Sequence, residues 1–551
     1  MKTCLHVFLL LLLSTPLFSQ GIEWNWFQIS QNNGESGLSV VEKYNDLLFT
    51  AGSTTNTIEF NDTIFNTTIK TAVIYSMQED GTSNWSKVLR SPRGSHVLDL
   101  GIMSNGNIIA LVKYGNRLEL DDQVLESNNL DSIYSDNHAV VCLDGLGNLE
   151  WWRNTSGASP FWGKLAISSG DEIVLSGFCA DIENFFSVTP INTLDSSQIW
   201  TPWGQSFWTY HHDYFAYLAK LSPTGEPLWV KENGGYVYDV VVNPNGQILT
   251  AGYINEITDF QSTEIVPFGT ETGYVCQFNE NGDFQWIKRF GGSANDNRLR
   301  GIALDPEGNI YATGSVLGNN VQIEGYETIP WSETNGLIVK LNANGNVVWY
   351  KLIGIDGWNL DEPNFNSGMC LAYGNDGVFV SGYAYNYINN DGFQLWSEGA
   401  PDLFVMHFNE NGICNYAKNH VTWGWNMGAD ILFSEGDVYI CGFSYSENWS
   451  SAEPSHSIIG KIGASDIILS SKDQTLTKAS FSVFPNPCEE FLSVQTGSME
   501  GIEFHIFNGQ GQLVHVEKTR GNGSIDIRNL PSGYYLITDI STGLSRSFLK
   551  R

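Results

Sequence analysis

Short apolar runs alternate with glycine-containing turns along most of the chain. One clear copy of the pattern is Leu304–Gly314, with the sequence Leu-Asp-Pro-Glu-Gly-Asn-Ile-Tyr-Ala-Thr-Gly. An apolar run reaches a tight turn, returns as an alternating strand and stops at a glycine. Period-two alternation and short apolar runs bounded by turn residues are typical of β-strands. The pattern therefore predicts an all-β protein, in which Asp305 and Gly308 make a turn.

Two half-motifs alternate, and each predicts a hairpin. In the first, a tryptophan follows a turn glycine by four residues; in the second, the returning strand ends at a glycine. Asn-Gly and Asp-Gly pairs supply the positive φ angles of tight turns. The first half-motif occurs at Gly81/Trp85, Gly147/Trp151, Gly225/Trp229, Gly282/Trp286 and Gly345/Trp349, and at Gly412 with Tyr416 in place of Trp. The second ends at Gly52, Gly177, Gly252, Gly314, Gly382 and Gly442, while Asn107–Lys113 lacks the final glycine.

Two hairpins per copy give the four strands of a propeller blade. The tryptophan would fill the gap between neighbouring twisted sheets. The first copy begins at Trp24-Asn25-Trp26 without a front hairpin, and an orphan strand, Ser457–Ile462, follows the last copy. Pairing these two ends would close a ring and remove exposed sheet edges. We predict a seven-bladed β-propeller over residues 20–469, with six or eight blades, or an open β-solenoid, as alternatives.

The repeats also resemble a known family. The segment Gly301–Tyr311 and the following strand Leu337–Asn342 are similar to the bacterial β-propeller repeats of many exported proteins. The resemblance covers residues from about 22 to 465 and implies a propeller. It implies no shared activity, because that family has no common chemistry.

The last part of the chain has a different pattern. Residues 470–480 are polar and predict a linker, and residues 481–551 hold short alternating strands that predict a small β-sandwich. The strands are expected at Leu492–Gln495, Glu503–Phe507, Ser524–Ile527 and Tyr534–Thr538.

This module resembles the type A C-terminal sorting domain of the bacterial type IX secretion system. The resemblance rests on Phe484-Pro485-Asn486-Pro487, on Ile506–Val514 with Gly511, on Ile525–Leu536 with Gly533 and Tyr535, and on the ending Phe548-Leu549-Lys550-Arg551. Cys488 departs from it, because a polar residue is usual there. The resemblance implies that the domain engages the type IX machinery, directs passage across the outer membrane and is then removed. The cargo is then released or attached to the cell surface.

The first 19 residues predict an export signal. Lys2 precedes an apolar core, Val7–Leu13, and Leu17-Phe18-Ser19 forms a cleavage site before Gln20. The core is too short to span a bilayer, and no later segment is long and apolar enough to do so. We expect transport by the Sec pathway and then by the type IX system, to the cell surface or the medium.

The net charge and the cysteine pattern exclude several classes of partner and site. The formal net charge is −32, which disfavours nucleic acid and anionic lipid as partners. The seven cysteines after residue 19 are odd in number and show no Cys-x-x-Cys spacing, which argues against a disulfide framework and a zinc site. Cys142, Cys276 and Cys441 lie in apolar runs, where a thiol behaves as a small buried hydrophobe.

The most unusual loop lies at residues 181–213. It contains Trp200, Trp203, Trp208 and Tyr210, with Gln205 and Asp213 as polar neighbours. Aromatic rings stack on the apolar faces of sugars, so the loop is a candidate glycan platform; the alternative is a small core that holds the loop down. These four aromatic residues are our candidate ligand-binding residues.

Other polar groups carry weaker signals. His211 and His212 are adjacent, so on a strand they point to opposite faces and predict no metal site. Asp361-Glu362, in a second insertion at Ile355–Ser367, shows no sign of facing carboxylates. Asn295-Asp296-Asn297 is a calcium loop or only a turn, and it lacks EF-hand spacing. We predict no cofactor and no catalytic residue.

The sequence thus favours a binding or adhesion module for an extracellular glycan or protein. The alternative is an extracellular glycan- or peptide-degrading enzyme with a site at the mouth of the propeller channel. Carboxylates or histidines gathered at that mouth would favour the enzyme, whereas aromatic and amide groups would favour binding.

Overall fold

The structure is a computed structural model of the 551-residue chain. It divides into two compact units, residues 1–468 and 469–551. It describes residues 24–29, 31–32, 36–60, 63–115, 117–126, 137–155, 158–179, 215–354, 366–385, 387–397, 401–420, 424–445, 455–463, 481–484, 488, 490–496, 501–508, 513–520, 523–539 and 545–551. The predicted signal peptide (1–19) and linker (470–480) lie outside these ranges. The regular elements in the described residues are all strands, and no helix there is long and apolar enough to cross a membrane.

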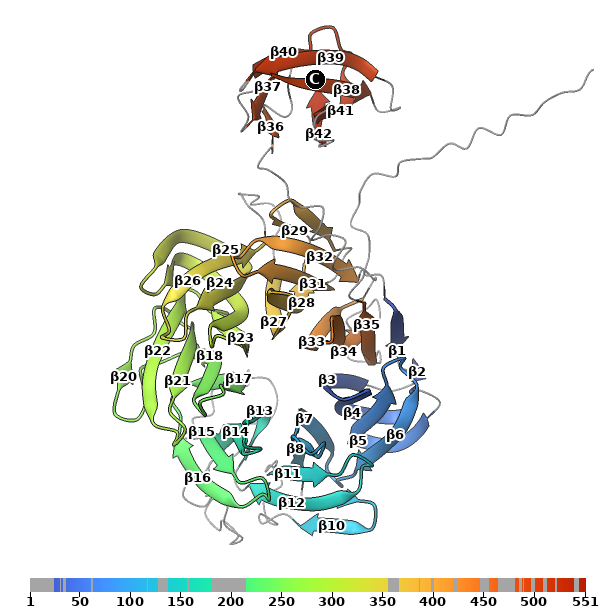
Figure 1. Ribbon diagram of the computed structural model, residues 1–551, viewed down its shortest axis with the longest axis vertical. Coiled ribbons are helices and arrows are strands. Elements are labelled where there is room, and N and C mark those ends of the chain that lie inside the picture. Colours follow the sequence, from blue (N-terminus) through green and yellow to red (C-terminus); the bar gives the residue numbers. More distant parts are fainter. Residues whose placement is uncertain are drawn as a thin grey trace, which may run out of the picture. The chain divides into compact units, whose positions relative to one another are not determined.

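The first unit is a ring of antiparallel sheets around a central axis (Figure 1). From the axis outward, the sheets are β3 (Ser36–Tyr44), β4 (Leu47–Phe60), β5 (Thr63–Gln78), β6 (Ser83–Leu89); β7 (Ser95–Ile102), β8 (Ile108–Tyr114), β11 (Asn137–Leu143), β12 (Leu149–Thr155); β13 (Ala158–Ile167), β14 (Ile173–Cys179), β15 (Phe215–Leu221), β16 (Pro227–Glu232); β17 (Tyr236–Val242), β18 (Ile248–Ile254), β21 (Thr272–Phe278), β22 (Phe284–Gly291); β23 (Arg298–Leu304), β24 (Ile310–Ile323), β25 (Glu327–Leu341), β26 (Val347–Ile353); β27 (Asn366–Tyr373), β28 (Gly377–Ala384), β31 (Asp402–Asn409), β32 (Cys414–His420); and β33 (Asn426–Ser434), β34 (Asp437–Tyr445), β35 (Ser455–Ile462), β1 (Trp26–Ile29). The short strands β2 (Gln31–Asn32), β9 (Arg117–Leu120), β10 (Gln123–Glu126), β19 (Thr258–Asp259), β20 (Glu264–Ile265), β29 (Tyr387–Asn390) and β30 (Phe393–Trp396) extend or connect these sheets.

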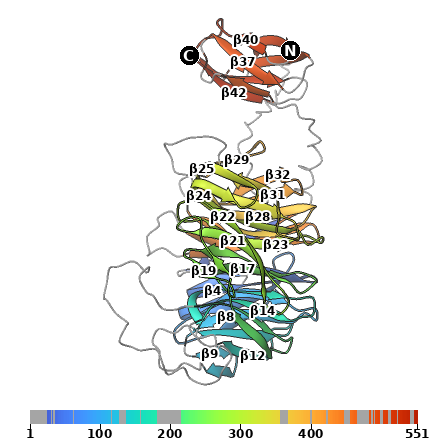
Figure 2. The ribbon, with the colours of Figure 1, turned by 90° about the vertical axis from the view of Figure 1, so that its left-hand side faces the viewer.

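The ring closes on itself. Each of the inner strands β3, β7, β13, β17, β23, β27 and β33 lies against the next, and β33 lies against β3. β1 pairs antiparallel with β35, with Trp26 opposite Lys461. This pairing of strands from the two ends of the repeat region confirms the predicted closure. Figure 2 shows the sheets from the side, following one another from β4 and β8 toward β28 and β31.

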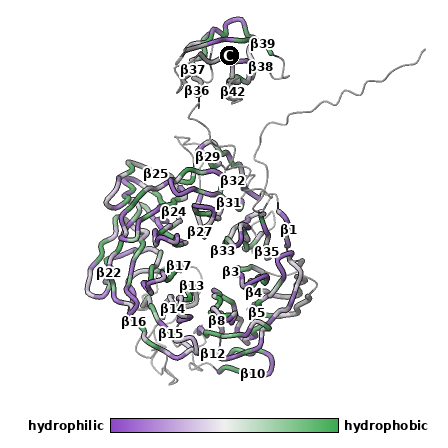
Figure 3. Tube along the Cα trace, viewed as in Figure 1, coloured by the Kyte–Doolittle hydropathy of each residue, from purple (hydrophilic) through white to green (hydrophobic). Residues whose placement is uncertain are grey.

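The hydrophobic core lies between successive sheets. One cluster joins β4 and β5 to β7, β8 and β11, and another joins β18 and β21 to β23, β24 and β25. Hydrophobic and hydrophilic residues alternate around the ring (Figure 3), as the period-two pattern requires. The thiols of Cys142, Cys276 and Cys441 are fully buried, which confirms their interpretation as small hydrophobes.

A β-bulge explains the glycine at the end of the second half-motif. In β17 the register shifts between Val237 and Asp239, and Gly252 of β18 lies opposite Val237. A Cβ on Gly252 would lie 1.7 Å from the carbonyl oxygen of Tyr236. Corresponding shifts occur in β3, β7, β23, β27 and β33. The glycine therefore makes room for backbone displaced by the bulge.

The tryptophan of the first half-motif packs on the turn glycine of the next sheet. A Cβ on Gly225 would lie 2.6 Å from Cζ3 of Trp151, and the glycine has a φ of +79°. The same contact joins Trp26 to Gly81, Trp85 to Gly147, Trp229 to Gly282, Trp286 to Gly345 and Trp349 to Gly412. The prediction that these rings fill the gaps between sheets is confirmed. Two constraints therefore favour glycine in these turns: the positive φ angle and the close contact with the indole.

The second unit consists of two facing sheets. One contains β36 (Phe481–Phe484), β37 (Phe491–Thr496) and β40 (Gly523–Asp526); the other contains β39 (Leu513–Arg520), β38 (Gly501–Asn508), β41 (Gly533–Asp539) and β42 (Ser545–Lys550). Residues from both sheets share one buried core that includes Leu492, Ile506 and Cys488. The four predicted strands are present as β37, β38, β40 and β41, while β36, β39 and β42 were not predicted.

Replacing Gly225 with alanine tests the tryptophan contact. The new Cβ would overlap Trp151, so we expect a loss of unfolding free energy of about 1–3 kcal/mol from overpacking, added to the cost of the positive φ. Gly392→Ala is the matched control, because Gly392 has a φ of +93° and a Cβ there meets nothing within 4 Å. Chemical denaturation of both variants measures the difference. Equal destabilisation by the two substitutions would contradict the proposed packing role.

Candidate functional site

Three tyrosines stack where the inner strand β17 begins. Tyr236 and Tyr253 are parallel with ring centroids 4.5 Å apart, and Tyr238 stacks on Tyr253 at 5.7 Å. Tyr236 is the first residue of β17, and Tyr238 is its bulged residue. The bulge turns Tyr238 toward the same side as its neighbours. Tyr236 and Tyr238 remain partly exposed, whereas Tyr253 is buried beneath them.

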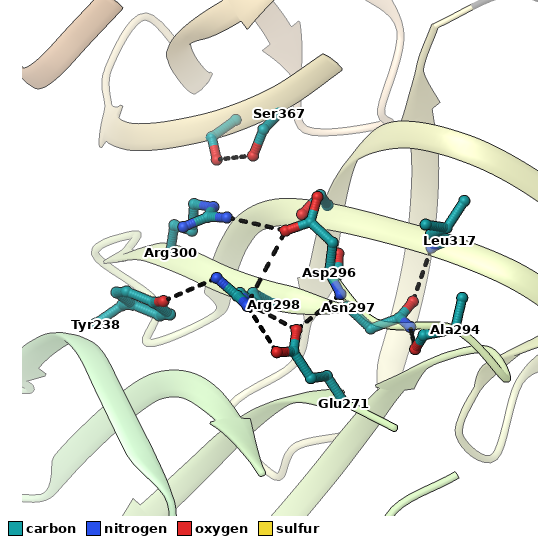
Figure 4. A network of polar contacts seen from close by, with 11 residues as sticks. Tyr238, Glu271, Ala294, Asp296, Asn297, Arg298, Arg300, Leu317 and Ser367 are labelled. Atoms are coloured by element: carbon teal, nitrogen blue, oxygen red, sulfur yellow. Dashed lines mark hydrogen bonds and ion pairs between the residues drawn. The ribbon is translucent and has the colours of Figure 1, made fainter. Parts of the chain in front are cut away.

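Two arginines from the next inner strand, β23, cover the tyrosines. The guanidinium carbon of Arg298 lies 4.8 Å from the centroid of Tyr253, and that of Arg300 lies 5.2 Å from the centroid of Tyr238. Both distances fit cation–π contacts. We call these five residues the Tyr–Arg cluster. Figure 4 shows its arginines between Tyr238 and the carboxylates of Glu271 and Asp296.

Each arginine has a carboxylate partner. Arg298 donates from Nε and Nη2 to Glu271, at 2.7 and 2.6 Å, in a bidentate pair. Arg300 donates from Nη2 to Asp296 at 3.2 Å. Two guanidinium groups thus face two carboxylates, and the network is neutral overall. Burial raises the pKa of Asp296, although Arg300 and Arg298 oppose the rise.

The same contacts bear on Asn295-Asp296-Asn297, which the sequence left open as a calcium loop or a turn. Asp296 is paired with Arg300, and Oδ1 of Asn297 accepts the backbone N–H groups of Gly292 and Leu317, at 3.2 and 2.8 Å. These contacts are those of a turn that holds β22 and β24 together. The segment positions Arg298 and Arg300.

Charged residues at equivalent positions of four inner strands line the axis. In each sheet the second strand carries the glycine that ends the second half-motif, or Val112 in its place. The charged residue pairs with the residue just before that position. The four residues are Asp99 on β7, Lys164 on β13, Asp239 on β17 and Asp430 on β33. We call these four residues the axial cluster. The charge of Asp99 disfavours ionisation of Asp239 and Asp430, and Lys164 offsets part of that repulsion.

Each aspartate of the axial cluster binds the next sheet. Oδ2 of Asp99 accepts the N–H of Leu165, that of Asp239 accepts the N–H of Ile302, and that of Asp430 accepts the N–H of Val41. All three distances are 2.9 Å. Because each bond joins equivalent places on successive inner strands, those strands run in one direction and begin at the same end of the ring. The aspartates therefore clasp neighbouring sheets together.

Burial changes the protonation of these carboxyl groups. It raises the pKa of Asp239 to about 6 and that of Asp430 to about 7, in each case against the opposing field of Lys164. Glu42 on β3 feels burial and then Asp430 and Asp99, which together raise its pKa to about 8. For Lys164, burial lowers the pKa, but the surrounding aspartates outweigh burial and raise it, so the ammonium stays charged.

Comparison with protein families identifies both parts of the chain. Residues 482–547 match the secretion system C-terminal sorting domain, and residues 285–320 match the β-propeller repeat. The chain is a β-propeller repeat protein with a type A sorting domain of the type IX secretion system. A sorting domain of this class implies secretion across the outer membrane to the cell surface or the exterior.

Solved structures with propeller-like folds match over much of the chain. They include a protein of unknown function from Bacteroides caccae (TM-score 0.27, 11% identity, covering 58% of this chain and 94% of that one), the polysaccharide lyase Uly1 (0.38, 9%, 77% and 90%) and a putative 6-phosphogluconolactonase from Bacteroides fragilis (0.36, 11%, 74% and 92%). Values this low carry no information about activity. No curated protein matches the sequence.

Gly533, Tyr535 and Lys550, three residues of the predicted sorting motif, are among the described residues. Tyr535 is buried and donates from its hydroxyl to the carbonyl oxygen of Pro531 at 2.7 Å. Gly533 pairs with Lys550 across β41 and β42, and Lys550 forms a bridge with Cys488. The chain end is thus fixed to the domain core. Pro485, Asn486, Pro487 and Gly511 lie outside the described residues.

The candidate ligand-binding residues Trp200, Trp203, Trp208 and Tyr210 also lie outside the described residues, as do His211-His212-Asp213 and Asp361-Glu362. The strands beside their loops are described. Cys179, the last residue of β14, pairs with Ala158, the first residue of β13. The segment 180–214 therefore leaves the sheet at the end where inner strands begin. β27 already begins at Asn366, so the second insertion is shorter than the predicted Ile355–Ser367.

Sequence reasoning missed both the Tyr–Arg cluster and the axial cluster. The repeats can be aligned on the glycine that ends the second half-motif, which Val112 replaces in one copy. This alignment would have placed Asp99, Lys164, Asp239 and Asp430 in corresponding positions. That signal marks a shared position but not the bond to the next sheet. For the Tyr–Arg cluster no local signal exists, since its residues come from three strands.

The axial carboxyl groups predict a pH dependence of stability. A carboxyl group whose pKa is higher in the folded state favours folding less as it ionises, so stability should fall as pH rises from about 5 to about 8. Glu42→Gln removes one such group and should flatten this fall, with the largest gain in melting temperature above pH 8, where the Glu42 carboxylate is ionised in the folded state. Glu150→Gln, at an exposed position on β12, is the control. Thermal unfolding from pH 5 to pH 9 measures the profiles, and identical profiles for wild type and Glu42→Gln would refute the assignment.

Proposed function

We propose that this protein is an exported binding module whose propeller holds a saccharide at the Tyr–Arg cluster. The propeller comprises seven blades within residues 20–469, a count supported by the repeat copies and the cycle of inner strands. The observation that carries the proposal is the partly exposed tyrosine stack beside two carboxylate-paired arginines.

The chemistry of the cluster suits a neutral sugar. Tyrosine rings offer apolar faces for the C–H groups of a pyranose, and their hydroxyls both donate and accept hydrogen bonds. Arg298 and Arg300 supply donors, while Glu271 and Asp296 supply acceptors. Because the charges of these four groups cancel, the cluster has no net preference for an ionic ligand.

The aromatic insertion extends the same platform in this proposal. Segment 180–214 and the Tyr–Arg cluster both belong to the end of the ring where inner strands begin. We therefore assign Trp200, Trp203, Trp208 and Tyr210 to ligand contact. A long polysaccharide or a glycosylated protein surface would use both parts, which suits adhesion.

The degrading-enzyme alternative is less well supported. Glycoside hydrolysis uses two carboxyl groups that face each other across the scissile bond. Among the described residues, Asp99, Asp239 and Asp430 instead bind backbone N–H groups of the next sheet, and Asp296 and Glu271 bind arginines. These contacts serve structure or ligand positioning.

Export completes the proposal. Residues 1–19 direct the chain through the Sec pathway, and residues 481–551, which include Pro485, Asn486, Pro487, Gly511, Gly533, Tyr535 and Lys550, direct it through the type IX machinery. The sorting domain is then removed at the 470–480 linker, and the propeller is released or held at the surface.

A glycan array tests the binding proposal. We expect the wild-type protein to bind at least one oligosaccharide class, and Tyr236→Ala and Trp203→Ala to weaken binding by about tenfold or more, which is about 1.4 kcal/mol. Tyr326→Ala is the control, because Tyr326 is an exposed tyrosine outside the cluster that packs edge-to-face against Tyr350. Wild-type affinity in Tyr236→Ala, or no glycan binding by the wild type, would end the proposal.

Deleting residues 481–551 tests the export proposal. The truncated chain should accumulate in the periplasm, because it keeps the Sec signal but lacks the domain that the type IX machinery recognises. Cell fractionation followed by immunoblotting measures its distribution. Trp203→Ala, with an intact sorting domain, should reach the surface normally. Surface delivery of the truncated chain would contradict the role assigned to residues 481–551.

A further inference from the structure

Three carboxylates from two successive sheets meet at the other end of the ring. Asp305 and Glu307 lie in the turn from β23 to β24, at the opposite end of β23 from Arg298, and Glu410 lies in the turn from β31 to β32. One oxygen of each carboxylate lies within 4.8 Å of the other two. Calcium binds oxygens at 2.3–2.6 Å, so oxygens on opposite sides of one ion lie about 4.6–5.2 Å apart. A single ion can therefore reach all three groups, which we call the turn triad.

A buried hydroxyl beside the triad has no hydrogen-bond partner. The side chain of Tyr311 is fully buried, and its hydroxyl oxygen accepts and donates no bond among the described residues. The ring centroid of Tyr311 lies 4.9 Å from the ammonium of Lys340, which is next to Asp305, and 5.9 Å from the ring centroid of Tyr373, which is hydrogen-bonded to Glu410. These contacts place Tyr311 beside the triad. A buried hydroxyl without a partner is costly, and an ion or its bound water would satisfy it.

The charges around the triad do not balance. Lys340 lies 3.7 Å from Oδ2 of Asp305 and 4.9 Å from the ring centroid of Tyr311. Asp305 also accepts bonds from Asn309, at 2.7 Å from its N–H and 2.8 Å from Nδ2, which fixes the carboxylate in the turn. One ammonium among three carboxylates leaves a net charge of −2, which a divalent cation would neutralise.

At the junction between the sheets of β33 and β3, a lysine occupies the place that corresponds to the centre of the turn triad. There the ammonium of Lys43 pairs with Glu79 and lies 2.7 Å from Glu435. Glu79 lies in the turn from β5 to β6, and Glu435 lies in the turn from β33 to β34. Tyr439 lies opposite Lys461 as Tyr311 lies opposite Lys340.

The residue that corresponds to Lys43 is Tyr373. Lys43 lies opposite Leu48 at the end of β3, and Tyr373 lies opposite Val378 at the end of β27. The hydroxyl of Tyr373 donates to Glu410 at 3.4 Å and brings no positive charge. The junction between the sheets of β33 and β3 thus has the Lys43 ammonium among its turn carboxylates. The junction between the sheets of β23 and β27 has the carboxylates but no corresponding lysine.

We propose that the turn triad of Asp305, Glu307 and Glu410 binds a divalent cation, calcium, between the sheets of β23 and β27. One buried and two exposed carboxylates on separate turns suit the irregular coordination of calcium better than the strict octahedron of magnesium. The indole of Trp349 donates to the backbone carbonyl of Glu410 at 2.8 Å and holds that turn in place. The ion would join the turns of the two sheets, as Lys43 does at the other junction. We expect the millimolar to submillimolar affinity that is typical of extracellular calcium modules.

Terbium luminescence and calorimetry on the full-length chain test the site. Trp349 and Tyr373 would sensitise bound Tb³⁺, and Ca²⁺ should displace it and raise the melting temperature. Glu410→Gln and Glu307→Gln should each weaken Ca²⁺ binding at least tenfold. Glu280→Gln, at the corresponding place in the turn from β21 to β22, should leave binding unchanged. Absence of saturable Ca²⁺ binding at 10 mM, or equal binding by Glu410→Gln and wild type, would overturn the proposal.

Tyr373→Lys gives a test that does not depend on loss of folding. It places an ammonium where Lys43 lies at the other junction, so it should abolish Ca²⁺ binding while the ion-free protein melts at or above the wild-type temperature. Retention of Ca²⁺ binding by a folded Tyr373→Lys variant would refute the site. Saccharide binding at the far end of the ring should be unaffected, so this result is independent of the proposed function.

Discussion

The ring depends on the contact between a tryptophan and the turn glycine of the next sheet. Twisted sheets splay as they leave the axis, and a bulky ring at their outer strands fills the space. The indole packs flat against the turn of the next sheet, and only glycine leaves room for it there because glycine has no Cβ. The indole N–H adds a directional bond in some copies, as from Trp85 to the carbonyl of Gly145 at 3.1 Å. The spacing of Gly and Trp in each repeat therefore reflects a contact between repeats.

The axial cluster fixes the inner edge as the tryptophans fix the outer edge. The inner strands are the edge strands of their sheets, and aspartates of the previous sheet accept backbone N–H groups from three of them. Burying carboxyl groups near one axis disfavours their charged forms, and neighbouring carboxylates add to this effect, so the pKa values of Asp239, Asp430 and Glu42 are raised. Lys164 offsets part of this effect.

The two ends of the ring carry different chemistry. Where inner strands begin, long insertions leave the sheets, and the Tyr–Arg cluster there is our proposed saccharide site. At the opposite end the turns are short and rich in carboxylates, which join neighbouring sheets through Lys43 or, as we propose, through a bound cation. The proposed sites of recognition and reinforcement thus lie at opposite ends of the ring.

The sequence by itself determined the strands of the repeats, their turns and the closure of the ring. These features follow from period-two alternation, turn glycines and an unpaired strand at each end of the repeats, which are all local signals. The sorting domain was likewise evident from its motifs. Tertiary structure alone decided which polar residues meet. Asp239 and Ile302, or Glu307 and Glu410, belong to separate repeats, so each looks like an ordinary residue of its own strand or turn. Only the stacking of one sheet on the next brings them within bonding distance, because a hydrogen bond or a shared ion depends on separation in space.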